Sequence, residues 1–284
     1  MATVIHDIFE MQRTGDTLRS SGRRIGLVPT MGALHDGHLS LVRIARERAD
    51  IVVTTIFVNP TQFGRGEDFD RYPRDLANDV ALASAAGTDI VFAPESAAMY
   101  PPAYRTYVHV EELTAILEGA VRPGHFRGVT TVVAKLFLVT KPHVAVFGQK
   151  DAQQVVVIRR MVHDLNFDID IVVAPIVRER DGLAMSSRNR YLTPEQRREA
   201  TVMHRSLRLA EELLRDGERN AAAVRTRMEA LITGHSSGVV DYISIADADS
   251  LREVELCSPG ENLLISLAVR FGTTRLIDNI PITL

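Results

Sequence analysis

The feature that most constrains the fold is an apolar, largely β-branched run without alternation, IVVTTIFV at Ile51–Val58. A strand with one face in water alternates apolar and polar residues, whereas a strand covered on both faces by helices does not. Runs of the same kind occur at 24–28, where we expect the strand to stop at Pro29, and at 89–94, 143–148 and 168–177. These runs predict a parallel sheet buried between helices.

Helical patterns separate these runs. Leu41, Val42 and Ala45 share one face of a predicted helix over 37–49. Further helices are predicted from about Leu76 to a left-handed cap at Gly87, over 128–142 with closure at Pro142, and from a capping Asp151 to about Leu165, with Gln154 at the capping-box position. Strands that alternate with helices over the first ~175 residues predict a doubly wound α/β domain.

The pattern changes after Val177. Thr193, Pro194 and Gln196 form a strong helix start, from which we expect one long helix to about Asp216 and a second after Asn220. The tail, VVDYISIAD and NLLISLAVRFGTTRLIDNI, predicts a few antiparallel strands. We therefore expect two domains, 1–176 and 177–284, of which the second is a smaller α+β domain.

Composition limits the partners and the compartment. The 284 residues carry a net charge of −3, so nothing global favours nucleic acid or an anionic membrane. Cys257 is the only cysteine, which excludes an internal disulfide and points to a reducing compartment. The N-terminus lacks a basic region followed by an apolar stretch, and no run approaches the ~20 apolar residues of a membrane span. We expect a cytoplasmic protein.

The segment TMGALHDGH, residues 30–38, lies where a strand gives way to a helix. Gly32 and Gly37 allow close approach of a ligand to the backbone, and the helix N-terminus beyond favours an anion. His35 and His38 add donors that can become cationic. A glycine turn with two solvated histidines and a phosphate cradle both remain open; a His-x-x-His metal pair is weaker, because no third ligand is near. The chain has neither GxxxxGK[ST] nor GxGxxG.

Three further polar loops follow predicted elements. FVNPTQFG offers the neutral amides of Asn59 and Gln62, FGQKDAQQ offers Lys150, and DGLAMSSRNRYL offers two hydroxyls and an arginine. Taken singly, FVNPTQFG is equally consistent with an Asn-Pro turn, a lysine such as Lys150 is more often a surface residue, and serine-rich loops are common. Because ligands bind at the carboxyl ends of strands in open α/β sheets, four such loops at one rim predict a binding site.

These segments resemble a known family. PTMGALHDGH, FVNPTQF, GQKDAQQ and MSSRN occur in the order and spacing of the pantoate–β-alanine ligases, and RPGHFRGVTTVVAKLF from Arg122 extends the resemblance over essentially the whole chain. The first motif is similar to the His-x-Gly-His signature of the wider nucleotidyltransferases, and MSSRN stands where relatives carry a KMSKS-type loop. Gln149 lies where many members have glutamate, which puts a charge-dependent role for that side chain in doubt.

The resemblance implies a Rossmann-like domain with a smaller C-terminal lid domain, a homodimer, and the substrates ATP, pantoate and β-alanine, with Mg²⁺. It implies a pantoyl adenylate intermediate, from which β-alanine displaces AMP. The implied catalytic groups are His35, His38, Lys150, Ser186, Ser187 and Arg188. The implied ATP-binding residues add Met31, Gly32, Ala33, Leu34, Asp36, Gly37, Gly148, Gln149, Asp151, Val177 and Met185.

The same resemblance implies that Gln62 and Gln154 bind pantoate, that Gln62 also faces β-alanine, and that Asn59 supports their pocket. Asp79 is either a carboxylate on the magnesium side or merely solvated. The alternative functions are another nucleotidyltransferase with a different small acceptor, a nucleotide sensor without turnover, and a metal hydrolase. A phosphorylated acceptor would favour arginines where this chain has Asn59 and Gln62, which argues against the first of these.

Overall fold

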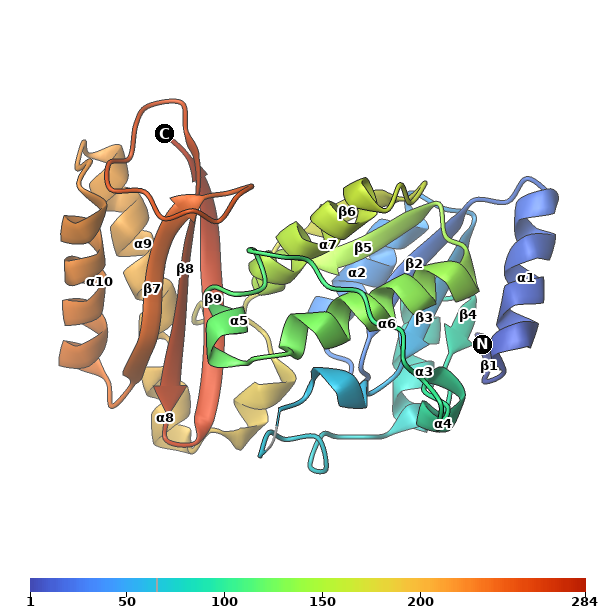
Figure 1. The fold of residues 1–284 in the computed structure, drawn as a ribbon. Helices are drawn as coiled ribbons and strands as arrows, with labels where there is room; N and C mark the ends of the chain where they lie inside the picture. Colours follow the sequence, from blue (N-terminus) through green and yellow to red (C-terminus); the bar gives the residue numbers. More distant parts are fainter. Residues whose placement is uncertain (65) are drawn as a thin grey trace. The chain divides into compact units, whose positions relative to one another are not determined.

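A computed structural model describes residues 1–64 and 66–284 (Figure 1). The chain forms two compact units: residues 1–148 with 154–175, and residues 149–153 with 176–284. The main crossing therefore lies between Pro175 and Ile176. Residues 149–153 follow a strand of the first unit but group with the second unit. The boundary expected from the sequence, between 176 and 177, assigns these five residues to the first domain.

The first unit is built on a six-stranded parallel sheet with the order β1-β4-β3-β2-β5-β6. Its strands are β1 (Thr3–Ile5), β2 (Ile25–Thr30), β3 (Ile51–Ile56), β4 (Ile90–Phe92), β5 (Val144–Gly148) and β6 (Asp170–Ala174). The strand order reverses beside β2, whose neighbours are β3 and β5. In open α/β sheets the loops at such a switch point bind ligands, so the loops after β2, β3 and β5 are the candidates.

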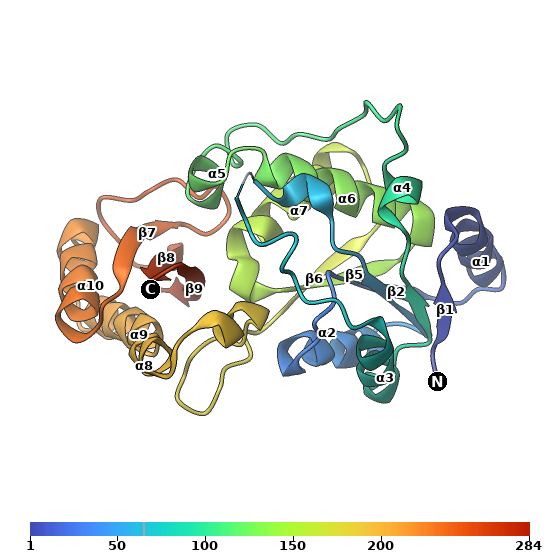
Figure 2. The ribbon, with the colours of Figure 1, turned by 90° about the horizontal axis from the view of Figure 1, so that it is seen from below.

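Helices cover both faces of this sheet (Figures 1 and 2). One face packs against α1 (Ile8–Ser20), α6 (His125–Thr140) and α7 (Ala152–Asp164), and the other against α2 (Asp36–Arg46) and α3 (Leu76–Ala86). The predicted face of α2 is buried, and α3 ends at Gly87 with φ +111°, the left-handed cap expected there. Short helices α4 (Ser96–Met99) and α5 (Glu118–Val121) complete the unit. The expected doubly wound parallel sheet is confirmed.

Two details differ from expectation. β2 runs through Pro29 to Thr30, because its pairing with β5 ends at Leu27 and the missing N–H of Pro29 interrupts no bond on that side. The three-residue edge strand β1 and the helix α1 were not predicted, although Asp7 at the N-cap of α1 with Glu10 three residues later is a local helix-start signal.

The second unit has an antiparallel sheet with the order β7-β8-β9, formed by β7 (Val239–Asp247), β8 (Asn262–Phe271) and β9 (Thr274–Thr283). The helices α9 (Val202–Arg215) and α10 (Ala221–His235) bury their apolar faces against it. The antiparallel tail and the smaller α+β unit are confirmed. Among the residues that the structure covers, no helix is long and apolar enough to cross a membrane.

The prediction of one long helix from Thr193 is wrong in one respect. The segment forms two helices, α8 (Pro194–Glu199) and α9. The capping box itself is confirmed: Gln196 N donates to Thr193 Oγ1 at 3.2 Å, and Thr193 N donates to Gln196 Oε1 at 3.1 Å. At the break, Met203 N bonds to Ala200 O, three residues back. The tighter 3₁₀-type bond interrupts the helix without reversing the chain.

Candidate functional site

A buried carboxylate holds the loop that follows β2. Asp79, on α3, is 1% exposed and accepts from the backbone N–H groups of Ala33 and Leu34, each at 2.8 Å. Gly32 has φ +81°, and a Cβ there would lie 2.7 Å from Asp79 Oδ2, so the loop needs glycine at this position. Asp79 is therefore not merely a solvated side chain.

The two histidines form a reciprocal cap at the N-terminus of α2. His35 Nδ1 accepts from Gly37 N at 3.1 Å, and His38 Nδ1 accepts more weakly from His35 N at 3.4 Å. The ring centroids lie 4.1 Å apart. Because each Nδ1 accepts, the proton of each neutral ring is on Nε2, which makes Nε2 the donor that can meet an anion.

The turn after β3 joins the loop after β2. The 3₁₀ turn η1 (Pro60–Gln62) is capped by Asn59, and Gln62 Nε2 lies 3.0 Å from Met31 Sδ. Asn59 Nδ2 donates to Gln62 Oε1 at 3.1 Å. The structure thus brings together Met31, Asn59 and Gln62, three of the residues predicted for the site.

Asn59 is 1% exposed and saturated by protein contacts. Its Oδ1 accepts from Thr61 Oγ1 and from the Tyr100 hydroxyl, each at 2.9 Å. Burial raises the pKa of Tyr100 to about 12, so its hydroxyl stays protonated as the donor. Asn59 therefore supports the turn that carries Gln62.

The sequence did not identify a second set of residues that holds this turn. His125 Nδ1 donates to the Gln62 carbonyl at 2.8 Å, and Arg122 Nη1 lies 3.2 Å from His125 Nε2. Arg122 also pairs with Glu67, with Nε–Oε1 at 2.8 Å and Nη2–Oε2 at 2.6 Å. The only signal was the segment RPGHFRG, in which a glycine turn places a histidine at the start of a helix.

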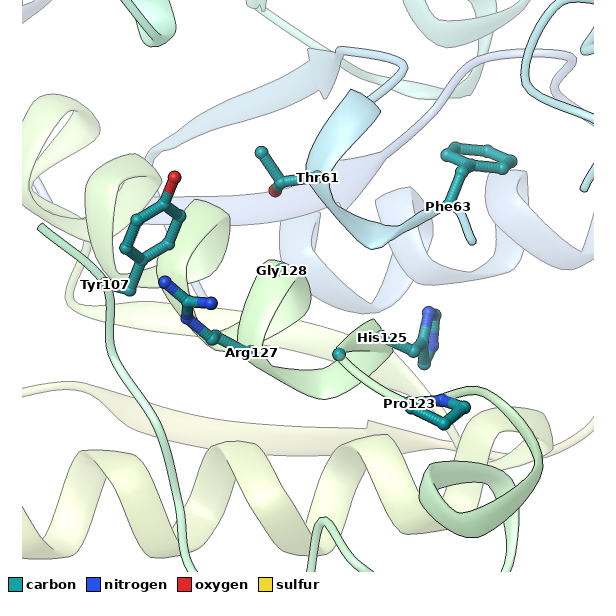
Figure 3. Close-up of a pocket in the computed structure, with 8 residues that line it drawn as sticks. Thr61, Phe63, Tyr107, Pro123, His125, Arg127 and Gly128 are labelled. Carbon is teal, nitrogen blue, oxygen red and sulfur yellow. The ribbon is translucent and has the colours of Figure 1, made fainter. Parts of the chain in front are cut away.

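Burial and neighbouring charges keep His125 and Glu67 each in one protonation state near pH 7. Burial and then the charge of Arg122 lower the pKa of His125 to about 4, so its ring is neutral near pH 7. Burial raises the pKa of Glu67, but the hydrogen bond and charge of Arg122 outweigh it, and the net pKa is lowered. His125 also lines a cavity of about 140 Å³ together with Thr61, Phe63 and Arg127 (Figure 3).

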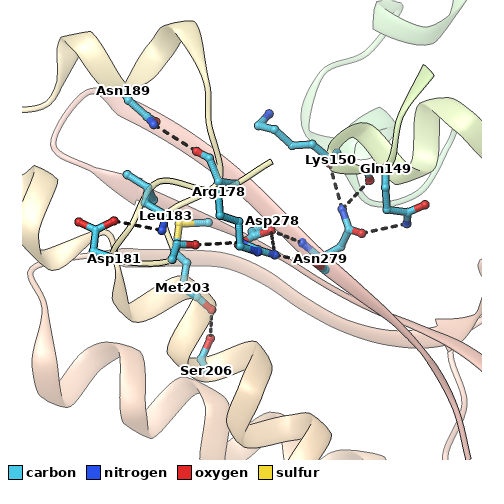
Figure 4. Close-up of polar contacts among 12 residues, drawn as sticks. Gln149, Lys150, Arg178, Asp181, Leu183, Asn189, Met203, Ser206, Asp278 and Asn279 are labelled. Atoms are coloured by element: carbon cyan, nitrogen blue, oxygen red, sulfur yellow. Dashed lines mark hydrogen bonds and ion pairs between the residues drawn. The ribbon is translucent and has the colours of Figure 1, made fainter. Parts of the chain in front are cut away.

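The turn η2 (Gln149–Asp151) belongs to the second unit and is held by β9. Asn279 Nδ2 donates to the carbonyls of Gln149 and Lys150 at 2.9 and 3.0 Å, and Gln149 Nε2 donates to Asn279 Oδ1 at 3.0 Å (Figure 4). Asp278, the residue before Asn279 on β9, makes a two-pronged ion pair with Arg178, with Nη1–Oδ2 at 2.6 Å and Nη2–Oδ1 at 3.0 Å. The Lys150 side chain thus projects from a fixed backbone.

The serine-rich loop also lies in the second unit. Met185 N bonds to Val177 O at 3.0 Å, which pairs two predicted site residues across the base of the loop. Ser186 caps η3 (Ser187–Tyr191) by accepting from Arg188 N at 3.2 Å. The remaining predicted residues lie in the first unit: Gly148 ends β5, and Gln154 is half-buried in the first turn of α7.

The described side chains do not favour a resident metal. Within 1–64 and 66–284, no group of three or more His, Cys, Asp or Glu side chains could hold an ion. Each carboxylate oxygen of Asp79 already accepts a backbone N–H, and the side chain is buried. These contacts do not favour Asp79 as a magnesium ligand.

Comparison with known proteins identifies one family. The model of the pantoate-beta-alanine ligase family matches residues 3–281. The chain is 54% identical to the pantothenate synthetase of Acetivibrio thermocellus, with 98% of each covered. The crystal structure of pantothenate synthetase from Thermus thermophilus is 45% identical, with a TM-score of 0.91 over 98% of both chains. That of the Francisella tularensis pantoate-beta-alanine ligase, complexed with beta-gamma ATP and beta-alanine, is 33% identical, with a TM-score of 0.79 over 99% of this chain and 97% of the other. The chain belongs to the pantoate-beta-alanine ligase family.

Proposed function

We propose that this protein is an ATP-dependent ligase that joins pantoate to β-alanine through a pantoyl adenylate. The observation that carries the proposal is the family match over residues 3–281. In the first step a pantoate carboxylate oxygen bonds to the α-phosphorus of ATP, and the bond from that phosphorus to the leaving pyrophosphate breaks. In the second, the amine nitrogen of β-alanine attacks the acyl carbon, AMP leaves with the bonding electrons, and the amine loses a proton.

The first step brings two anions together, so alignment and charge neutralisation dominate its barrier. His35 and His38 donate through Nε2 to the phosphates, supported by the N-terminus of α2, and His38 serves the α-phosphate. Lys150 neutralises the leaving group, and Ser186, Ser187 and Arg188 bind the phosphates from the second unit. The contacts that support these roles are the Nδ1 bonds that orient both imidazoles and the Asn279 bonds that fix the backbone of Lys150.

The acceptor side uses neutral amides. Gln62 and Gln154 bind the hydroxyls and carboxylate of pantoate without adding a repelling charge, Gln62 also faces β-alanine, and Asn59 supports the turn. Asp151 binds the ribose, and backbone groups near Gly148 and Val177 bind the nucleoside. Magnesium arrives with the phosphates of ATP, as is usual for this ion. A homodimer working in the cytoplasm completes the proposal, and sedimentation should give twice the 31.4 kDa chain mass.

One assay tests the function. Protein, ATP, magnesium and pantoate are mixed with and without β-alanine, and AMP and pantothenate are measured. We expect AMP and pantothenate to form in equal amounts over many turnovers, and only when β-alanine is present. ATP binding without pyrophosphate release would instead indicate a sensor. Turnover with a different small acceptor would indicate another nucleotidyltransferase, and chelator-sensitive hydrolysis without ATP would indicate a metal hydrolase.

A further inference from the structure

The turn that carries Gln62 is clamped to the first turn of α6. Asn59 Nδ2 donates to the Gly128 carbonyl at 3.1 Å, and His125 Nδ1 donates to the Gln62 carbonyl at 2.8 Å. A Cβ on Gly128 would lie 2.6 Å from the Gln62 backbone nitrogen, so only glycine allows this close approach. Figure 3 shows His125 and Gly128 on α6 beside the turn that contains Thr61. The turn is thus fixed at both of its ends.

The His125 ring is itself held in one orientation. Because a carbonyl only accepts, Nδ1 carries the proton, and Nε2 accepts from Arg122. Arg122 donates two hydrogen bonds to the carboxylate of Glu67, which lies five residues after Gln62. A two-pronged pair of this kind fixes both distance and angle. The chain Gln62–His125–Arg122–Glu67 therefore begins and ends on the same loop.

We propose that His125 is a positioning residue for the acceptor substrate, which fixes through the Gln62 carbonyl where the Gln62 side chain meets pantoate. Arg122 and Glu67 hold the ring, and among the described residues Glu118 is the remaining charged group that acts on it. The inference rests on the proposed role of Gln62 in binding pantoate. His125 acts through the backbone of Gln62 and does not touch the reacting atoms.

The test compares two replacements that differ in one donor. His125→Asn keeps an N–H near the position of Nδ1, whereas His125→Leu removes it. A displacement of about 1 Å costs roughly 100-fold, so we expect His125→Leu to raise the KM for pantoate about 10- to 100-fold. His125→Asn should stay within about threefold of the wild type, and neither should change the KM for ATP by more than about threefold.

His6→Leu is the matched control, since His6 Nδ1 also donates to a backbone carbonyl in the first unit, but to that of Ala93, at 2.6 Å, and not to one in the turn. We expect it to leave both KM values unchanged. If His125→Leu does not fold, Glu67→Gln replaces it, because it removes the ionic grip on Arg122 and should raise the KM for pantoate by about 3- to 10-fold. Equal rises in the KM for pantoate and the KM for ATP in His125→Leu, or no rise in either, would overturn the inference.

A double-mutant cycle separates this inference from the roles on which it rests. In a Gln62→Ala background, adding His125→Leu should change the KM for pantoate by less than about threefold, because the group being positioned is gone. Full additivity would refute positioning through Gln62. An unchanged KM for pantoate in Gln62→Ala alone would refute the role of Gln62, and with it the inference. If the wild-type protein forms no pantothenate, the proposed function itself is refuted.

Discussion

Histidines in the first unit are used in opposite ways. In His35 and His38, Nδ1 accepts from the backbone and leaves the proton on Nε2, which suits the proposed donation to phosphates. In His125, Nδ1 donates to a carbonyl and Nε2 accepts from a guanidinium. The first arrangement suits chemistry with phosphates, and the second suits a neutral structural link.

The neutral state of His125 makes stability depend on pH. Its pKa is about 4 in the folded protein against 6.5 in the unfolded chain. The unfolded state therefore binds more protons between these values, and the free energy of unfolding falls as the pH falls through this window. Between pH 7 and pH 5 this group should remove about 2 kcal/mol.

His125→Asn, which does not titrate, isolates that contribution. Urea unfolding at pH 7 and pH 5 should show a smaller acid-induced loss of stability in the variant than in the wild type, by about 2 kcal/mol. Identical losses in the two proteins would mean that the folded pKa of His125 is not depressed.

Gly32 provides a second test at the scale of one residue. Gly32→Ala places a Cβ at a positive φ and 2.7 Å from the Asp79 carboxylate. Gly22→Ala has a similar φ of +75°, but its Cβ would have no described atom within 4 Å. Both should lose about 1–2 kcal/mol of stability from the backbone, whereas Gly32→Ala alone should also raise the KM for ATP about tenfold or more. Equal KM values in the two variants would contradict a role of this loop in binding ATP.

At the scale of elements, α3 holds the loop after β2 through Asp79. Asp79→Asn replaces one accepting oxygen by a donor and leaves a buried N–H of Ala33 or Leu34 without its partner, at a cost of about 1–3 kcal/mol. We expect a raised KM for ATP and an unchanged concentration of magnesium at half-maximal activity. Asp75→Asn, at the cap of the same helix, is the control, because asparagine caps equally well. A shift in the magnesium midpoint of Asp79→Asn alone would show that Asp79 binds the metal.

Local signals in the sequence were sufficient for much of the fold. The apolar run at Ile51 predicts β3, because a strand buried on both faces needs no polar positions. Gly87 marks the end of α3 and Thr193 the start of α8, since left-handed caps and capping boxes involve only neighbouring residues. The order of elements follows from such signals.

Contacts between distant residues could not be predicted in this way. Asp79 meets Ala33 from 46 positions away, and Glu67 meets Arg122 from 55. No local pattern distinguishes a charged side chain that will be buried and paired from one that stays in water. The same holds for β1, whose three residues pair only at the edge of the sheet. The support of the proposed site therefore emerges only from the folded chain.

At the scale of the whole molecule, the proposed phosphate-binding groups divide between the two units. His35 and His38 lie in the first, whereas Lys150 and residues 186–188 lie in the second. Lys150 belongs there because Asn279, on β9, donates to the carbonyls of both Gln149 and Lys150. A short turn between β5 and α7 is thus tied to a sheet more than a hundred residues further along the chain.

This tie predicts that Asn279 affects the first chemical step through Lys150. Lys150→Ala should slow pyrophosphate release about 10²- to 10³-fold, because it removes a charge that acts in the transition state, and should weaken pantoate binding far less. Asn279→Ala leaves the charge but frees its backbone, and should slow the same step about 10- to 100-fold. The measurement is single-turnover pyrophosphate release from ATP and pantoate without β-alanine.

The matched control is Asn262→Ala, since Asn262 lies on the adjacent strand β8 and its side chain bonds to Thr283 instead of the turn. It should leave the rate of pyrophosphate release unchanged. The decisive variant combines Asn279→Ala with Lys150→Ala. If Asn279 works by holding Lys150, the double variant is no slower than Lys150→Ala alone, because a backbone freed beneath an alanine has no ammonium group left to misplace. Multiplying losses would instead place Asn279 in a separate role, and the link from β9 to the leaving phosphates would be wrong.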